Sequence, residues 1–199
     1  MPEGEGRGVV VADPEPPAGA QVWQRPEWRV GDAFVLLRGA QARLRFTVAE
    51  AGPTGYLLVS DDGNRMRRDL DLGILGEWAA DGDEATRLLS PVDTRCHWPL
   101  WVGKKWRCEF VERSRGGPAL PLQVGYEVEG LDTITVAGGT FSALRIVRTA
   151  RLMIEGQRFL DRSSVIWYAP EPGLEVRQLI GESMIELVEW TRAPVTSPK

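Results

Sequence analysis

The sequence predicts an all-β fold, and two features of its pattern lead to that expectation. Apolar and polar residues alternate over many short segments, which is the period of a half-buried β-strand. Turn-forming residues, mostly glycine, proline and aspartate, separate these segments at short intervals. Because successive strands joined by short turns pair in antiparallel order, we expect an antiparallel meander that forms a strongly curved sheet.

The chain is organised around residues 98–110, which hold three of its eight tryptophans. Trp106, Cys108 and Phe110 share one face of an alternating segment within this stretch, and charged residues occupy the other face. This pattern predicts a strand with one buried side. Gly103 precedes the strand and permits the positive φ that would turn the chain onto a sheet.

Before this stretch, alternation predicts strands at residues 42–48, 56–60 and 66–72. Residues 73–90 lack a regular period, and we interpret them as a loop with a short strand near residues 86–89. Such a loop could lie across the opening of a curved sheet as a lid.

After the middle stretch, the strands carry apolar residues on both faces. Leu144 and Ile146, for example, alternate with Ala143 and Val147. We therefore expect these strands to be covered on both sides or to curl around something. They are predicted at residues 120–128, 134–136, 141–152, 158–168, 174–180 and 183–190.

Length and composition favour one domain. The 199 residues are 43% hydrophobic, which suffices for one large core, and all-β proteins of this size commonly form a single domain. We place that domain at residues 21–192. Residues 1–20 are poor in apolar side chains and are predicted to be a disordered tail. Residues 193–199 are predicted to be a disordered C-terminus.

Three motifs between residues 90 and 190 carry a family resemblance. The first joins Trp98-Pro99-Leu100 to Val102-Gly103-Lys104-Lys105-Trp106. The second is Val136-Ala137-Gly138-Gly139-Thr140-Phe141-Ser142-Ala143-Leu144-Arg145-Ile146, and the third is Trp167-Tyr168-Ala169-Pro170-Glu171-Pro172-Gly173-Leu174-Glu175-Val176. In this order they resemble an uncharacterised family of bacterial envelope β-proteins, which pairs FPLxVGxxW with VPAGTFxAxxI and WYxPxxGxV.

The chain departs from the family pattern at Trp98, where phenylalanine is usual, and at Ala137-Gly138, where Pro-Ala is usual. The resemblance implies a fold similar to the half-open β-barrels of the lipoprotein carriers LolA and LolB, whose concave faces hold acyl chains. It also implies a place in the bacterial periplasm or at the outer membrane. It supplies no catalytic residues.

Charge and hydropathy argue against several partners. The 24 basic and 28 acidic residues give a net charge of −4, which offers no basic surface for nucleic acid or an anionic membrane. No apolar run approaches the roughly eighteen residues of a membrane-spanning helix. The apolar run at residues 9–12 is too short for a signal peptide. We expect no nucleic-acid partner, no transmembrane segment and no signal peptide in this chain.

The chain has two cysteines, Cys96 and Cys108. They could form a disulfide in an oxidising compartment, or they could be two small buried residues in a reducing one. The sequence leaves both alternatives open. With no further cysteine and a single histidine, a zinc site is not expected, and no cofactor motif is present.

The sequence shows no nucleophile elbow and no other catalytic motif. His97 is the single histidine, and we interpret it as a surface or turn residue. Asp161 stands within a predicted strand, where an ion pair with Arg145 or Arg148 is favoured over a role as a general acid. We therefore expect a protein that is not an enzyme.

Two functions agree with these observations. In the first, a lipid or other hydrophobic small molecule binds the concave face through Trp106, Phe110, Tyr126 and Trp167. In the alternative, the aromatic residues are ordinary core, and the chain is an interaction or scaffold module that docks a protein partner through an edge strand or loop. The family resemblance favours the first.

Overall fold

The computed structural model describes residues 9–12, 15–39, 42–154 and 162–194. Within these ranges the chain forms strands and no helix. The strands are β1 (Val10–Val11), β2 (Ala33–Arg38), β3 (Ala42–Gly52), β4 (Gly55–Ser60), β5 (Arg65–Arg68), β6 (Ile74–Trp78), β7 (Ala85–Ser90), β8 (Lys105–Ser114), β9 (Ala119–Val136), β10 (Gly139–Leu152), β11 (Arg162–Ala169), β12 (Leu174–Ile180) and β13 (Ser183–Thr191).

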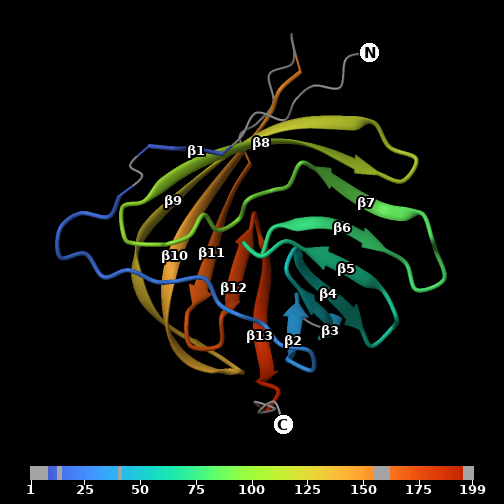
Figure 1. The fold of residues 1–199 in the computed structure, drawn as a ribbon, viewed down its shortest axis with the longest axis horizontal. Coiled ribbons are helices and arrows are strands. Elements are labelled where there is room, and N and C mark those ends of the chain that lie inside the picture. The colour runs from blue at the N-terminus through green and yellow to red at the C-terminus, as the bar shows by residue number, and fades with distance from the viewer. Residues whose placement is uncertain (1–8, 13–14, 40–41, 155–161, 195–199) are drawn as a thin grey trace.

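The strands β2 to β13 form an antiparallel barrel in which every strand pairs with its neighbours in sequence (Figure 1). The last strand, β13, pairs with the first, β2, from Thr191 opposite Ala33 to Ile185 opposite Arg38. The predicted all-β meander is therefore confirmed, but the barrel is closed rather than half-open. Closure satisfies the backbone groups that would otherwise be left at two open edges.

Strand β1 lies outside this ring, within the residues predicted to be a disordered tail. Val10 pairs with Arg107 and Val11 with Trp106, on the edge of β8 that β7 leaves uncovered, because β7 pairs only with residues 111–114. Two β-branched residues suit such an added strand. The rest of the prediction for residues 1–8 and 13–14 lies outside the described residues.

At the other terminus, the backbone N–H of Ala193 donates to Asp32 Oδ1 at 2.8 Å. Asp32 also accepts a hydrogen bond from Arg192 Nη1 at 2.6 Å. The predicted disordered C-terminus thus begins with a residue that is bonded to the barrel. Residues 195–199 lie outside the described part of the chain.

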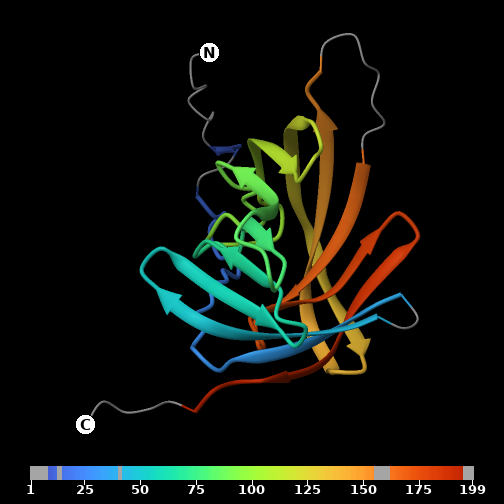
Figure 2. The same ribbon diagram turned by 90° about the vertical axis from the view of Figure 1, so that its right-hand side faces the viewer.

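Residues 73–90 are not a lid. They supply β6 and β7, which pair with each other and connect β5 to β8 in the barrel wall. The irregular pattern that suggested a loop has a local cause, because register shifts interrupt the pairing of β6 with both of its neighbours. Figure 2 shows these short strands on one side of the barrel and the long strands on the other.

The segment predicted as two strands, 120–128 and 134–136, is one strand, β9. Its ladder with β10 shifts at one point, where Gly130 is opposite Arg145 and Val128 is opposite Ile146. The extra residue makes a β-bulge, which bends a long strand without ending it.

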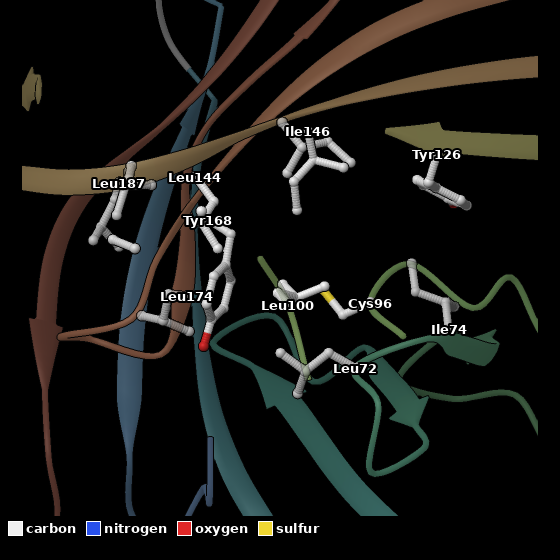
Figure 3. Packing of buried hydrophobic residues seen from close by; sticks show 14 of the residues in the cluster. Leu72, Ile74, Cys96, Leu100, Tyr126, Leu144, Ile146, Tyr168, Leu174 and Leu187 are labelled. Carbon is white, nitrogen blue, oxygen red and sulfur yellow. The ribbon is translucent and has the colours of Figure 1, made fainter. Parts of the chain in front are cut away.

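Part of the barrel interior is filled by a packed core of buried hydrophobic residues (Figure 3). The segment that precedes β8 contributes Cys96 and Leu100 to this core, where they meet Ile146 and Tyr168 from the barrel wall. Gly103 has φ +97°, which confirms the expected turn before β8. Residues 91–104, between β7 and β8, thus cross the barrel and fill part of its interior; we call them the crossing segment.

Lys104 stabilises the crossing segment through hydrogen bonds to its backbone. Its side chain is buried and donates to the carbonyl oxygens of His97 and Pro99, each at 2.6 Å. The ammonium group also lies 4.3 Å from the ring centre of Trp101, a cation–π contact. Burial lowers the pKa of Lys104 to about 8.

Candidate functional site

The unfilled part of the barrel is a cavity of about 590 Å³. It is lined by residues from β2 to β7, from β10 to β13 and from the segments that cross the barrel: Trp28, Phe34, Leu36, Arg38, Leu44, Phe46, Ser60, Asn64, Arg65, Met66, Arg68, Leu72, Ile74, Glu77, Trp78, Ala79, Thr86, Arg87, Leu89, Asp93, Arg95, Arg148, Ser164, Leu174, Glu175, Gln178, Ile180 and Ile185. The volume falls within the range of small-molecule sites, about 300–1,000 Å³.

Strand alternation explains the apolar part of this lining. Leu44 and Phe46 point into the cavity from β3. Arg43 and Arg45, which alternate with them, lie on the outer face. Leu36 lies opposite Leu44 on the neighbouring strand β2. These side chains build an apolar wall toward one end of the barrel.

The exposed fractions of the lining residues distinguish the floor of the cavity from its rim. Trp28 and Leu72 line it where their side chains are buried, and the indole Nε1 of Trp28 donates to the carbonyl of Gly173 at 3.0 Å. Ile180 also lines the cavity but is 44% exposed. Ile180 therefore lies at the rim, and Trp28 and Leu72 form the floor.

Charged residues line the cavity in unequal numbers. Six arginines face three carboxylates, which leaves an excess of three positive charges in a chain whose net charge is −4. The arginines are Arg38, Arg65, Arg68, Arg87, Arg95 and Arg148, and the carboxylates are Glu77, Asp93 and Glu175. The site is thus cationic within an acidic protein.

Asp93 forms one of the two largely buried ion pairs on the cavity lining. Its Oδ2 accepts a hydrogen bond from Arg148 Nη2 at 2.9 Å, and its Oδ1 accepts one from the Tyr126 hydroxyl. Arg148 Nε donates in turn to the Tyr126 oxygen at 3.0 Å. Burial and the Asp93 carboxylate raise the pKa of Tyr126, so its hydroxyl keeps its proton and acts as a donor.

Two further arginines have carboxylate partners. Arg87 is paired with Glu112 at 2.8 Å and with Glu77 at 3.4 Å. Arg95 Nε lies 3.3 Å from Glu175 Oε1, and both side chains are largely buried. These pairs attach β6, β7 and β8 to one another and the crossing segment to β12.

The structure separates the predicted ligand residues from the cavity. Trp106, Phe110 and Tyr126 are buried inside the barrel, but they belong to the packed core and none of them lines the cavity. Trp167 is half-buried and lies on the outer face, between Ile166 and Tyr168, which point inward. Its indole Nε1 donates to Asp132 Oδ2 at 2.9 Å.

The two cysteines do not form a disulfide in the structure. Cys96 and Cys108 are both free thiols and both buried. Cys108 Sγ faces Asp93 Oδ1 at 3.8 Å. In the described part of the chain, no group of histidine, cysteine and carboxylate side chains could hold a metal ion.

His97 is partly buried beside Lys104, and burial lowers its pKa, as does the Lys104 charge. Asp161 lies outside the described residues. The arginines proposed as its partners are engaged elsewhere, Arg145 with Glu129 and Asp132, and Arg148 with Asp93.

None of the described residues forms a helix of the length and hydropathy that a membrane span requires. No family model matches the chain, and no curated protein matches its sequence.

Solved structures do resemble it. The hypothetical lipoprotein YmcC from Escherichia coli has a TM-score of 0.54 and 10% identity, over 82% of this chain and 88% of that chain. A candidate exported protein with a YmcC-like fold from Bacteroides fragilis has a TM-score of 0.49 and 13% identity, over 85% of this chain and 100% of that chain. A candidate lipoprotein from Parabacteroides distasonis has a TM-score of 0.46 and 10% identity, over 85% and 99% of the two chains. At this identity the likeness to YmcC shows a shared fold alone.

Proposed function

We propose that this protein is a non-catalytic binding protein that holds a hydrophobic small molecule, a lipid or an acyl chain, inside its barrel. The observation that carries the proposal is the cavity of about 590 Å³, because well-packed protein interiors leave few voids larger than a water molecule. Small-molecule sites are concave and are lined mainly by apolar side chains with a few polar groups that orient the ligand.

The place of the cavity supports binding through a different set of residues from the one that the sequence indicated. Leu36, Leu44 and Phe46 line it from β2 and β3, and Ile180 and Ile185 line it from the adjoining strands β12 and β13. These residues take the role that was expected of Trp106 and its aromatic neighbours.

A non-catalytic role agrees with the chemistry of the buried nucleophiles. Burial raises the pKa of Cys108 to about 12 and raises that of Cys96 as well. Thiols of this kind hold little of the thiolate that reacts. The carboxylates that line the cavity, Glu77, Asp93 and Glu175, are each engaged in an ion pair with arginine.

We place this function in the bacterial envelope. The fold is shared with a protein described as a lipoprotein, and the motif resemblance leads to the same compartment. The motif resemblance also implies a fold similar to LolA and LolB, whose concave faces hold acyl chains. We include an acyl chain among the proposed ligands for this reason.

Filling the cavity is expected to abolish binding of a neutral apolar probe. N-phenylnaphthylamine should bind the native protein at one saturable site with enhanced fluorescence, and Leu36→Trp should weaken this binding by about tenfold or more. The indole would enter the empty space beside Leu44, so the melting temperature should change little.

Leu37→Trp is the matched control, because Leu37 is the next residue of β2 and does not line the cavity. It should bind the probe as the native protein does. If the native protein shows no saturable binding, or if both variants lose it equally, the cavity is not a ligand site and the scaffold alternative takes its place.

A further inference from the structure

We infer that the ligand of this cavity is an amphiphile with an anionic head group, and that the head group binds at Arg68 and Arg95 on the floor of the cavity. The inference rests on the proposed function and adds to it the charge of the ligand and its orientation.

Arg68 carries the first part of the argument, because its half-buried guanidinium forms no ion pair among the described residues. It donates from Nη1 to the carbonyl of Leu72 at 3.0 Å and contacts Met66 Sδ through Nε at 3.4 Å. It also lies 5.8 Å from the ring centre of Trp28. A guanidinium stays charged in proteins, so the groups in direct contact with this charge are dipoles and a ring face.

Arg95 adds a second cation close to the first. The two arginines share one carboxylate, because Glu175 is the ion-pair partner of Arg95 and also the strongest charge that favours the ionised form of Arg68. Burial lowers the pKa of Arg68, and the Arg95 charge lowers it further. Glu77 also attracts Arg68 and Asp93 also attracts Arg95, both more weakly than Glu175 does. Over the whole lining the arginines still exceed the carboxylates by three, a positive charge that an anion would neutralise.

Buried polar atoms without hydrogen-bond partners lie along the same cavity. Within the described residues, Arg65 Nε and Ser164 Oγ are buried and make no hydrogen bond. Ser164 is only 6% exposed and lines the cavity. Most buried polar groups in proteins are satisfied, so these atoms are positions on the cavity wall where water or a polar ligand atom would bind.

The arrangement of charge and apolar surface gives the ligand a direction. The guanidinium of Arg68 is at the floor beside Leu72, whereas Leu44 and Ile185 line the wall toward Ile180 at the exposed rim. An acyl chain with a terminal anion matches this order when the head group enters first. The apolar tail would then extend toward the rim.

Displacement of N-phenylnaphthylamine by three ligands of equal chain length tests the inference. Dodecanoate and dodecyl phosphate carry an anionic head group, and dodecanol carries a neutral one. At least one of the two anions should displace the probe at a concentration about tenfold lower than dodecanol, which is the gain expected from a charge-assisted hydrogen bond. The tighter of the two anions identifies the head group.

Arg68→Gln should remove this preference, while Arg67→Gln should keep it. The two arginines are neighbours on β5, but Arg67 is exposed and does not line the cavity. Arg95→Gln changes the second arginine of the proposed head-group site and serves where Arg68→Gln does not fold. Dodecanol should bind all folded variants within about twofold of the native protein.

The outcomes separate this inference from the proposed function. Equal displacement by the anions and dodecanol, or a preference that survives in the folded variants of Arg68→Gln and Arg95→Gln, overturns the anionic head group and leaves the apolar site intact. No displacement by any of the three ligands, together with no binding of the probe, overturns the proposed function itself.

Discussion

Replacing Asp93 by alanine is expected to lower the free energy of unfolding by about 3–5 kcal/mol, the usual cost of removing one partner of a buried ion pair. The change would leave the Arg148 guanidinium without its carboxylate and the Tyr126 hydroxyl without its acceptor. Arg148 and Asp93 side chains are 19% and 8% exposed, so water replaces little of the lost interaction. Urea unfolding of the native protein and the variant measures the difference.

Two controls show whether burial is the cause. Glu189→Ala removes the partner of Arg43 in an exposed pair, with side chains 59% and 57% exposed, and should cost at most about 1 kcal/mol. The double variant Asp93→Leu with Arg148→Met removes both charges and should regain most of the loss. A loss below about 1 kcal/mol for Asp93→Ala would contradict a buried pair.

Replacing Trp106 by alanine is expected to cost about 3–5 kcal/mol, the range for truncating a buried aromatic side chain. Trp106 is 2% exposed, stacks on Tyr126 with ring centres 5.0 Å apart, and donates from Nε1 to the carbonyl of Thr94 at 2.8 Å. The change would leave a hole between β8, β9 and the crossing segment. Chemical denaturation at neutral pH measures it.

Trp167→Ala is the control for Trp106→Ala. Trp167 is half-buried on the outer face and contacts Arg177 and Asp132. Trp167→Ala should lower the free energy of unfolding by clearly less than Trp106→Ala does. Equal costs for the two variants would show that the assignment of inner and outer faces is wrong.

The fold was largely predictable because most strands are amphipathic in the local sequence. The alternation of Trp106, Cys108 and Phe110 is enough to assign β8 and its buried side. Closure of the barrel was not predictable, because it depends on the pairing of β13 with β2, which are far apart in the chain. Strand β6 was missed, since register shifts interrupt its pairing with both neighbours, whereas the short strand expected near residues 86–89 is β7.

The site was harder to predict than the fold. Sequence alternation correctly places Trp106 and Phe110 inside, but it does not tell which inner residues fill the core and which line a cavity. One signal was available in β10, where Arg148 stands in register with Leu144 and Ile146 on the buried face. A charged residue at a buried position of a strand indicates an interior ion pair or ligand.

The charge of Arg68 concealed its place in β5. Arg68 lies opposite Tyr56 and Met66 lies opposite Leu58, and both partners are buried, so strand alternation places Arg68 on the inner face with Met66. Arg65 also lines the cavity. An arginine in register with the apolar residues of a strand was the available signal for a charged interior.

A crystal structure with dodecanoate brominated at its terminal carbon tests the central claim most directly. Anomalous scattering locates the bromine independently of the rest of the ligand. We expect the bromine near the rim, beside Ile180 and Ile185, and the carboxylate within hydrogen-bond distance of the Arg68 guanidinium. An interior without ligand, or a bromine at the floor beside Trp28 with the carboxylate outside, would contradict the account.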